Sequence, residues 1–244
     1  SYNSFEGVQR ILNKVMLCEN VSIVVSDDSD HLKSAENIKN FIESLANPNI
    51  IYVKHLSQGN PVDNWNHLLS MVNSKYFTVV HHDEAYSNNL FLDELKKVNN
   101  SKKILVFSSK IIYQNGSVRN VYSSLQKILI RFSKHFKLHN FIGGPCSLLI
   151  IRSDQLEYFN RNLKWLVDVD WYNKIFSKVN YKDIYFFSDT HINSFISHNS
   201  ITAKLQPNLR SIKQKEIEFL KSEYQIMHAS SKVFNFLSYL AFKF

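Results

Sequence analysis

The stretch YFTVVHHDEAY (residues 76–86) joins an apolar run to four adjacent polar side chains that can bind metal. The carboxylates of Asp83 and Glu84 are hard oxygen ligands, which Mg²⁺ or Mn²⁺ takes together with substrate phosphates. His81 and His82 would also suit zinc, but no HxxxH pair or second His-rich motif accompanies them. Four polar groups at the end of a buried strand are costly to desolvate unless they are paired or bind metal. The stretch favours a divalent-cation site, with a solvated turn as the alternative.

A second acidic group, Asp27 and Asp28, directly follows the β-branched run VSIVVS (residues 21–26). Asp or Ser at such a position commonly caps the helix that follows, and capping would explain one of the two acids. The functional alternative is a carboxylate that accepts a hydrogen bond from the base or sugar of a nucleotide. Taken alone, this pair favours capping, because short motifs are weak evidence.

A third pair of acids, Asp168 and Asp170, lies in the helical segment WLVDVDWYNKIF (residues 165–176). Residues two apart do not share a face of a helix, so the two carboxylates must have different partners. One of them can be a general base whose pKa is raised by the surrounding apolar side chains. The alternative is that one acid caps the helix and the other is solvated.

The remaining candidates are weaker alone. Only five glycines occur in the chain, which gives weight to the pair Gly143 and Gly144. His198 is more typical of a structural or surface histidine, and Cys146 of a small core residue. Cys146 and Cys18 are far apart and form no CxxC pair, which favours a reducing compartment.

The elements that must position these side chains alternate between strands and helices. Parallel strands that deliver acids at their carboxyl ends open onto one crevice, so we expect the first two acidic groups to face each other. We expect strands at 21–26, 50–53, 76–80, 103–109 and 111–118, with a turn at Asn115 and Gly116, and at 185–187. We expect helices at 5–17, 35–45, 65–72 and 165–176.

Whole-chain properties limit the class of protein. The 244 residues suit one domain of the larger kind, or one domain with an appended tail, and 44% hydrophobic residues argue against disorder. The net charge of +8 favours an anionic partner such as nucleotide phosphate, nucleic acid or a membrane surface. No apolar run is long enough to span a bilayer and the start lacks a signal pattern. We therefore expect a cytoplasmic protein, with a peripheral position on the inner membrane as an alternative.

Taken in order, these motifs resemble those of the family 2 glycosyltransferases of the GT-A fold, especially bacterial enzymes that make O-antigen or capsule polysaccharide. The resemblance extends to about Thr202. The series is SYNS, VSIVVSDDSD, NWNHLLSMVNSKYFTVVHHDE, FIGGPCSLLIIR, LVDVDWYNKI and SHNSIT. It implies an α/β fold of the GT-A (Rossmann-like) type, with a mainly parallel central sheet flanked by helices. The expected divisions are residues 1–205, with a nucleotide-binding half at 1–100 and an acceptor half at 101–205, and a helical tail at 206–244.

The resemblance also implies roles for individual residues. The family's DxD motif falls on HHDE, so His81 stands where the first acid is usual. The family has an apolar strand before the segment that SYNS resembles, so we expect that a few residues are missing at the start, with loss of a strand from the sheet as the alternative. Asp170 takes the place of the catalytic base. The cation, Mn²⁺ or Mg²⁺, falls to Asp83 and Glu84, with His198 as a weak third ligand. The expected nucleotide-sugar contacts are Tyr2, Asn3, Asp27, Asp28, Asn66, His82, Asp83, Gly143, Gly144 and Asp168.

The implied reaction is an inverting, single-displacement transfer from a nucleotide-diphosphate sugar, with UDP favoured. The acceptor would be a glycan or a polyprenyl-diphosphate-linked saccharide in surface polysaccharide synthesis, as for a hexosyltransferase. The apolar, aromatic and basic segment at 232–244 is too short to span a membrane, but it suits a membrane interface or packing on the domain. The alternatives are a non-catalytic protein that binds sugar nucleotides or glycans and, less favoured, a nucleic-acid-binding module, because the ordered acids would repel phosphate.

Overall fold

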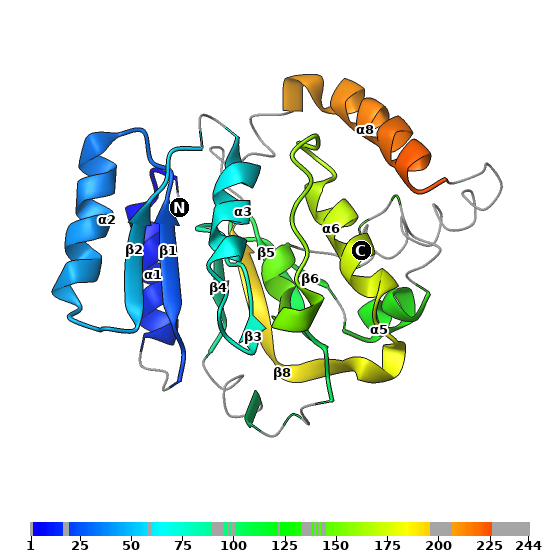
Figure 1. Ribbon diagram of the computed structural model, residues 1–244, viewed down its shortest axis with the longest axis horizontal. Helices are drawn as coiled ribbons and strands as arrows, with labels where there is room; N and C mark the ends of the chain where they lie inside the picture. The colour runs from blue at the N-terminus through cyan, green and yellow to red at the C-terminus, as the bar shows by residue number, and fades with distance from the viewer. Residues whose placement is uncertain are drawn as a thin grey trace.

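The computed structural model places helices on both sides of two β-sheets (Figure 1). It describes residues 2–16, 20–57, 60–88, 95, 96, 98, 101–121, 123–132, 138, 140, 142, 145–195 and 206–225. The expected α/β fold with a flanked central sheet is confirmed.

The N-terminal elements form a small parallel unit. Strands β1 and β2 pair in parallel, from Ile23 opposite Ile50 to Asp27 opposite Lys54. Apolar residues at helical spacing, Val8 and Leu12, bury one face of the first helix against this unit. The elements are α1 (Phe5–Val15), β1 (Ile23–Asp27), α2 (Leu32–Ser44) and β2 (Ile50–Lys54).

The larger sheet has six strands in the order β3-β7-β5-β8-β4, with β6 paired to β5. Among the described strands of this sheet, β5 and β8 run parallel and the other pairings are antiparallel. The sheet is thus mixed, rather than mainly parallel as the sequence predicts. The strands are β3 (Tyr76–Phe77), β4 (Glu84–Tyr86), β5 (Ile104–Ile112), β6 (Val118–Val121), β7 (Leu149–Arg152) and β8 (Ile184–Phe195).

Two local differences from the predicted strands have clear causes. The run at 103–118 forms one long strand and a hairpin, because the turn falls only at Gly116, whose φ is 78°. The predicted strand at 76–80 pairs with β7 only through Tyr76 and Phe77. The following residues leave the sheet and turn at His81 before β4 begins at Glu84, which brings the polar side chains out of the ladder.

The remaining helices cover the larger sheet and its main core. Helix α6 is the most deeply buried, with Trp171 and Tyr172 fully enclosed. The helices are α3 (Pro61–Ser70), α5 (Ser123–Arg131), α6 (Val167–Ser177) and α8 (Leu209–Glu223), with short 3-10 turns at Cys146–Leu148, Ser153–Gln155, Tyr181–Asp183 and Gln206–Asn208. Of the predicted tail, the structure describes 206–225. None of the described helices combines the length and apolar content that crossing a bilayer requires.

Candidate active site

The turn between β3 and β4 gathers three side chains that can bind a cation. Ligand atoms of His81, Asp83 and Glu84 all lie within 4.8 Å of one another. The turn is fixed from within, because the Glu84 amide donates to the His81 carbonyl at 3.1 Å and the His81 amide donates to Glu84 Oε2 at 3.0 Å. It is fixed from outside by the Phe195 amide of β8, which donates to the Asp83 carbonyl at 2.7 Å. One imidazole and two carboxylates form a donor set that suits Mn²⁺ or Mg²⁺.

Burial gives this cluster unusual acid–base properties. The side chain of Glu84 is buried, and desolvation, with the Asp83 carboxylate beside it, raises the pKa of Glu84 to about 8. A bound cation would supply the positive charge that otherwise a proton supplies. The neighbouring His82 is different, since burial lowers its pKa to about 4 and leaves a neutral imidazole at pH 7.

His81 is held by contacts on two further sides. Its Nε2 lies 3.0 Å from Cys146 Sγ, and its ring lies 4.6 Å from the ring of Trp65. Burial raises the pKa of the Cys146 thiol well above its usual value, so this thiol is not a nucleophile. Cys146 thus fits its prediction as a buried core residue, and it also holds the imidazole of the cluster in place.

Asp168 is the carboxylate of α6 that faces this cluster. Burial raises the pKa of Asp168 to about 6; among its charged neighbours His81 opposes the rise, while Glu84 and Asp83 add to it. Its Oδ1 is buried and has no hydrogen-bond partner among the described residues. An unpartnered carboxylate with a pKa near neutrality, beside a cation-binding group, is suited to accept a proton.

Asp170, the residue expected to be the base, lies in a different environment. It is fully buried; its Oδ1 accepts from the Tyr224 hydroxyl at 2.6 Å and its Oδ2 lies 2.7 Å from Lys174 Nζ. Asp170 Oδ1 is therefore hydrogen-bonded to the end of α8, while Oδ2 has an ion pair within α6 but no hydrogen bond among the described residues. The geometry favours Asp168 over Asp170 for proton transfer.

Helix α8 also holds the first turn of α6, which carries Asp168. The buried Glu216 of α8 accepts from the amides of Lys164 at 2.6 Å, Trp165 at 3.1 Å and Leu166 at 2.8 Å. These amides belong to the residues that lead into α6 and end at its N-cap, Leu166, where a negative charge is favourable. The α8 contacts through Glu216 and Tyr224 thereby fix the N-terminal part of α6.

The N-terminal segment and the turn after β1 meet, as the sequence predicts. The Tyr2 hydroxyl donates to Asp30 Oδ2 at 2.8 Å, and the Asn3 side chain donates to Asp30 Oδ1 at 2.6 Å. These hydrogen bonds lower the pKa of Asp30, with the Asn3 contact as the larger cause. The Asn3 amide also donates to Ser29 Oγ at 2.7 Å. Tyr2 and Asn3 thus lie at the carboxyl end of β1.

The two acids after β1 already have partners inside the protein. Asp27 is fully buried and accepts from Ser29 Oγ at 2.5 Å and the Tyr52 hydroxyl at 3.0 Å. Asp28 accepts from the Ser57 amide at 2.7 Å and also from its hydroxyl. These contacts shape the turn, but neither acid caps α2, whose N-cap is His31 and receives no side-chain cap hydrogen bond.

A close approach of helix α1 joins the two parts of the site. A Cβ on Gly7 would lie 2.2 Å from the His82 carbonyl oxygen and 2.6 Å from Ser4 Oγ. Only glycine allows the helix that starts after Tyr2 and Asn3 to rest on the His82 backbone. The acidic turn after β1 and the HHDE turn are therefore neighbours of the same helix.

Other predicted site residues lie elsewhere. The Asn66 amide donates to the Phe159 carbonyl at 3.0 Å and its oxygen accepts from the Phe159 amide at 2.8 Å, so Asn66 anchors the loop that contains Phe159. Gly143, Gly144 and His198 lie outside the described residues. Sequence reasoning missed Asp30 and Glu216. SDDSD (residues 26–30) does contain Asp30, whereas nothing in the sequence connects Glu216 to a helix 50 residues earlier.

Comparison with known proteins identifies the family. Residues 1–159 match the family described as Glycosyl transferase family 2. No curated protein matches the sequence.

Among solved structures, S. aureus TarS 1–349 aligns with a TM-score of 0.60 and 20% identity over 80% of this chain and 58% of that chain. The same fragment in complex with UDP aligns with a TM-score of 0.60 and 20% identity over 81% of this chain and 59% of that chain. The mannosyltransferase PcManGT from Pyrobaculum calidifontis, in complex with GDP-Man and Mn²⁺, aligns with a TM-score of 0.63 and 10% identity over 98% of this chain and 66% of that chain. The chain thus spans about three fifths of TarS 1–349. At these identities the likeness shows a shared fold, the GT-A type of α/β fold.

Proposed function

Because the chain belongs to glycosyl transferase family 2, we propose that it is a glycosyltransferase that uses a nucleotide-sugar donor. The observation that carries this proposal is Asp168, whose unpartnered carboxylate lies beside the cation-binding cluster. A proton acceptor and a cation site are the two groups that sugar transfer from a diphosphate donor needs.

The cluster fits a divalent cation, for which we propose Mn²⁺ or Mg²⁺. His81, Asp83 and Glu84 would hold it, with His81 in place of the first acid of the family's motif. A bound cation neutralises the negative charge that develops on a diphosphate leaving group. With its pKa raised to about 8, the buried Glu84 is mostly protonated at pH 7 without a cation, and a bound cation would stabilise its charged form.

Asp168 is the proposed general base of an inverting displacement. It would take the proton from the acceptor hydroxyl as that oxygen attacks the anomeric carbon, and no covalent enzyme intermediate forms. Asp170 becomes a positioning residue, because Tyr224 and Lys174 hold its carboxylate inside the protein. The raised pKa of Asp168 suits a base that works near neutral pH.

For the donor we propose a UDP-sugar, bound between the Tyr2–Asn3 segment and the HHDE turn. In support, TarS 1–349 has been solved with UDP and PcManGT with GDP-Man and Mn²⁺. For the acceptor we propose a glycan or lipid-linked saccharide of surface polysaccharide synthesis, such as O-antigen or capsule, as the order of motifs suggests.

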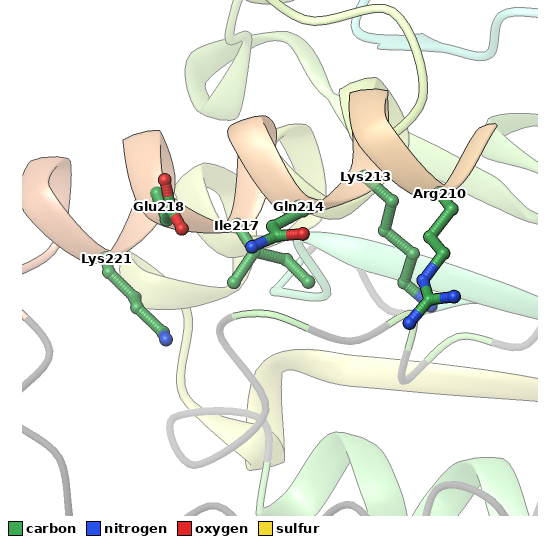
Figure 2. A pocket seen from close by; sticks show the side chains of 6 residues that line it. All are labelled: Arg210, Lys213, Gln214, Ile217, Glu218 and Lys221. Atoms are coloured by element: carbon green, nitrogen blue, oxygen red, sulfur yellow. The ribbon is translucent and has the colours of Figure 1, made fainter. Parts of the chain in front are cut away.

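A peripheral contact with an anionic membrane on the cytoplasmic side extends this proposal. Arg210, Lys213 and Lys221 project from one side of α8, beside a cavity of about 290 Å³ (Figure 2). They add cationic side chains to a chain whose last residues, 232–244, are already basic and aromatic. Each lysine or arginine close to an anionic surface contributes about 1 kcal/mol to binding.

A second candidate is a non-catalytic protein that binds sugar nucleotides, and His81 in place of an acid is the observation that favours it. A panel of nucleotide-sugars with Mn²⁺ or Mg²⁺ separates the two. We expect one donor to raise the melting temperature in a cation-dependent way and to release its nucleoside diphosphate. Binding without any release would favour the second candidate, and no binding by any donor would contradict both.

A further inference from the structure

A groove away from the cation cluster has the features of a second ligand site. It has a volume of about 730 Å³ and lies between the outer face of α3, the loop at 157–161 and α6. Trp65 of α3 separates it from the cluster, because its ring contacts both His81, at 4.6 Å, and Phe159, at 5.3 Å. The groove and the cluster thus lie on two sides of one aromatic wall.

The walls of the groove are fixed before any ligand arrives. Asn66 binds both the amide and the carbonyl of Phe159, and the Trp171 indole donates to the Glu157 carbonyl at 2.7 Å. Phe159 stacks on Trp171 with ring centroids 4.6 Å apart. A preformed wall reduces the ordering cost of binding.

Flat rings provide much of the lining. The imidazoles of His55 and His67 are stacked, with centroids 4.2 Å apart and planes 10° apart. Burial, and His55 beside it, lower the pKa of His67, so this ring is neutral at pH 7. Tyr158 lies 48% exposed on the opposite wall. Such rings present an apolar face together with a polar edge.

The charges that face the groove are already matched. Arg161 Nε lies 2.6 Å from Asp63 Oδ1, across the groove from α3 to the loop, and Lys174 lies 2.7 Å from Asp170. Glu157 is paired with Lys178. No net positive charge is left among these pairs to attract phosphate or an acidic polymer, while their remaining polar atoms can still exchange hydrogen bonds with hydroxyl groups.

We propose that this groove binds the sugar units of a neutral glycan, with Tyr158 and the His55–His67 pair as stacking surfaces. The proposal rests on the glycosyltransferase function and names its acceptor as a neutral saccharide chain. The groove would hold units of that chain apart from the one that receives the new sugar.

The test is binding of the full chain to an array of neutral glycans, anionic glycans and single-stranded nucleic acid. We expect at least one neutral glycan to bind, and Tyr158→Ala to weaken its binding at least tenfold. Ser70→Tyr, which places bulk in the groove from α3, should have the same effect. Tyr181→Ala is the matched control, since Tyr181 is 41% exposed and does not line the groove.

Three outcomes would overturn the proposal: no neutral glycan binds, only anionic ligands bind, or Tyr158→Ala and Ser70→Tyr bind as the wild type does. Calorimetry with UDP and Mn²⁺ separates this result from the proposed function. If donor binding persists while glycan binding is absent, the groove proposal alone fails. If no nucleotide-sugar is bound or cleaved but the neutral glycan still requires Tyr158, the enzyme proposal alone fails.

Discussion

Replacing Asp168 and Asp170 separately by Asn should separate catalysis from stability. Asp168→Asn removes the unpartnered carboxylate beside the cluster, and loss of a general base lowers the rate by about 10² to 10⁴. Its stability should not fall, because no hydrogen bond of the buried Oδ1 is lost. Asp170→Asn instead removes a buried charge that Lys174 and Tyr224 contact at 2.7 and 2.6 Å.

The cost of Asp170→Asn follows from its surroundings. Breaking a buried ion pair costs about 3 to 5 kcal/mol, and the 30% exposure of the Lys174 side chain reduces this to about 2 to 3 kcal/mol. In a chain of this size that loss corresponds to about 4 to 12 °C in melting temperature. The Asp168→Asn melting temperature should stay within about 1 °C of the wild type, since the carboxyl it replaces adds no paired contact.

The assay measures nucleoside diphosphate release with the donor that the panel identifies, together with a thermal melt and donor binding by calorimetry. Tyr224→Phe is the matched control for the Asp170 contact, and its effect should not add to that of Asp170→Asn. The reasoning is refuted if Asp168→Asn retains more than a tenth of wild-type turnover. It is equally refuted if Asp170→Asn abolishes turnover while its melting temperature is unchanged.

Three further predictions concern the elements around the cluster. Gly7→Ala should weaken donor binding and destabilise the fold, because its Cβ would meet the His82 carbonyl at 2.2 Å; calorimetry and a thermal melt measure both, and an unchanged variant contradicts the close approach. Glu216→Gln should lower kcat by a larger factor than it raises KM, because the start of the helix that carries Asp168 is no longer held in place. The control is Glu218→Gln at an exposed position, and an equal loss of kcat in this variant would argue against a positioning role for Glu216. The raised pKa of Glu84, about 8, means that the cation-free fold binds a proton more tightly than the unfolded chain, so its stability should fall as pH rises from about 4.5 to 8. Below pH 8, the affinity for Mn²⁺ should rise about tenfold for each unit by which the pH rises, because Glu84 must release its proton to bind the ion. Mn²⁺ binding that does not depend on pH would exclude Glu84 as a ligand.

The order of elements and their periodicity were readable from the sequence, because local spacing determines them. Helices at 5–17, 35–45 and 165–176 were placed within a few residues, and the turn at Gly116 was found from its Asn–Gly pair. The mixed sheet was not predictable in this way. Antiparallel pairing of β7 with both β3 and β5 depends on contacts between residues far apart in the chain. The apolar residues of a strand do not predict whether it will run parallel or antiparallel to its neighbours.

The HHDE turn was recognised from residue types alone. Residue types did not show which polar side chains bind a ligand and which hold the protein backbone in place. Asn66 illustrates the limit, since its place at the start of a helix that resembles one in the family implied a donor contact. In the fold it binds the backbone amide and carbonyl of Phe159, a residue 93 positions later in the sequence. A polar side chain can satisfy a distant backbone as well as a ligand, and the sequence contains no sign of which one it does.

Asp168 and Asp170 show how the missing information enters. Residues two apart on a helix are turned about 200° from one another, so from the sequence only one of them can face the crevice. Which of the two faces the crevice depends on the element that packs against the opposite face of α6. Helix α8 lies there and brings Tyr224 to Asp170, and its Glu216 closes the start of the same helix. Residues 206–225, part of the expected tail, thus set the orientation of α6 and leave Asp168 as the carboxylate that faces the cation cluster.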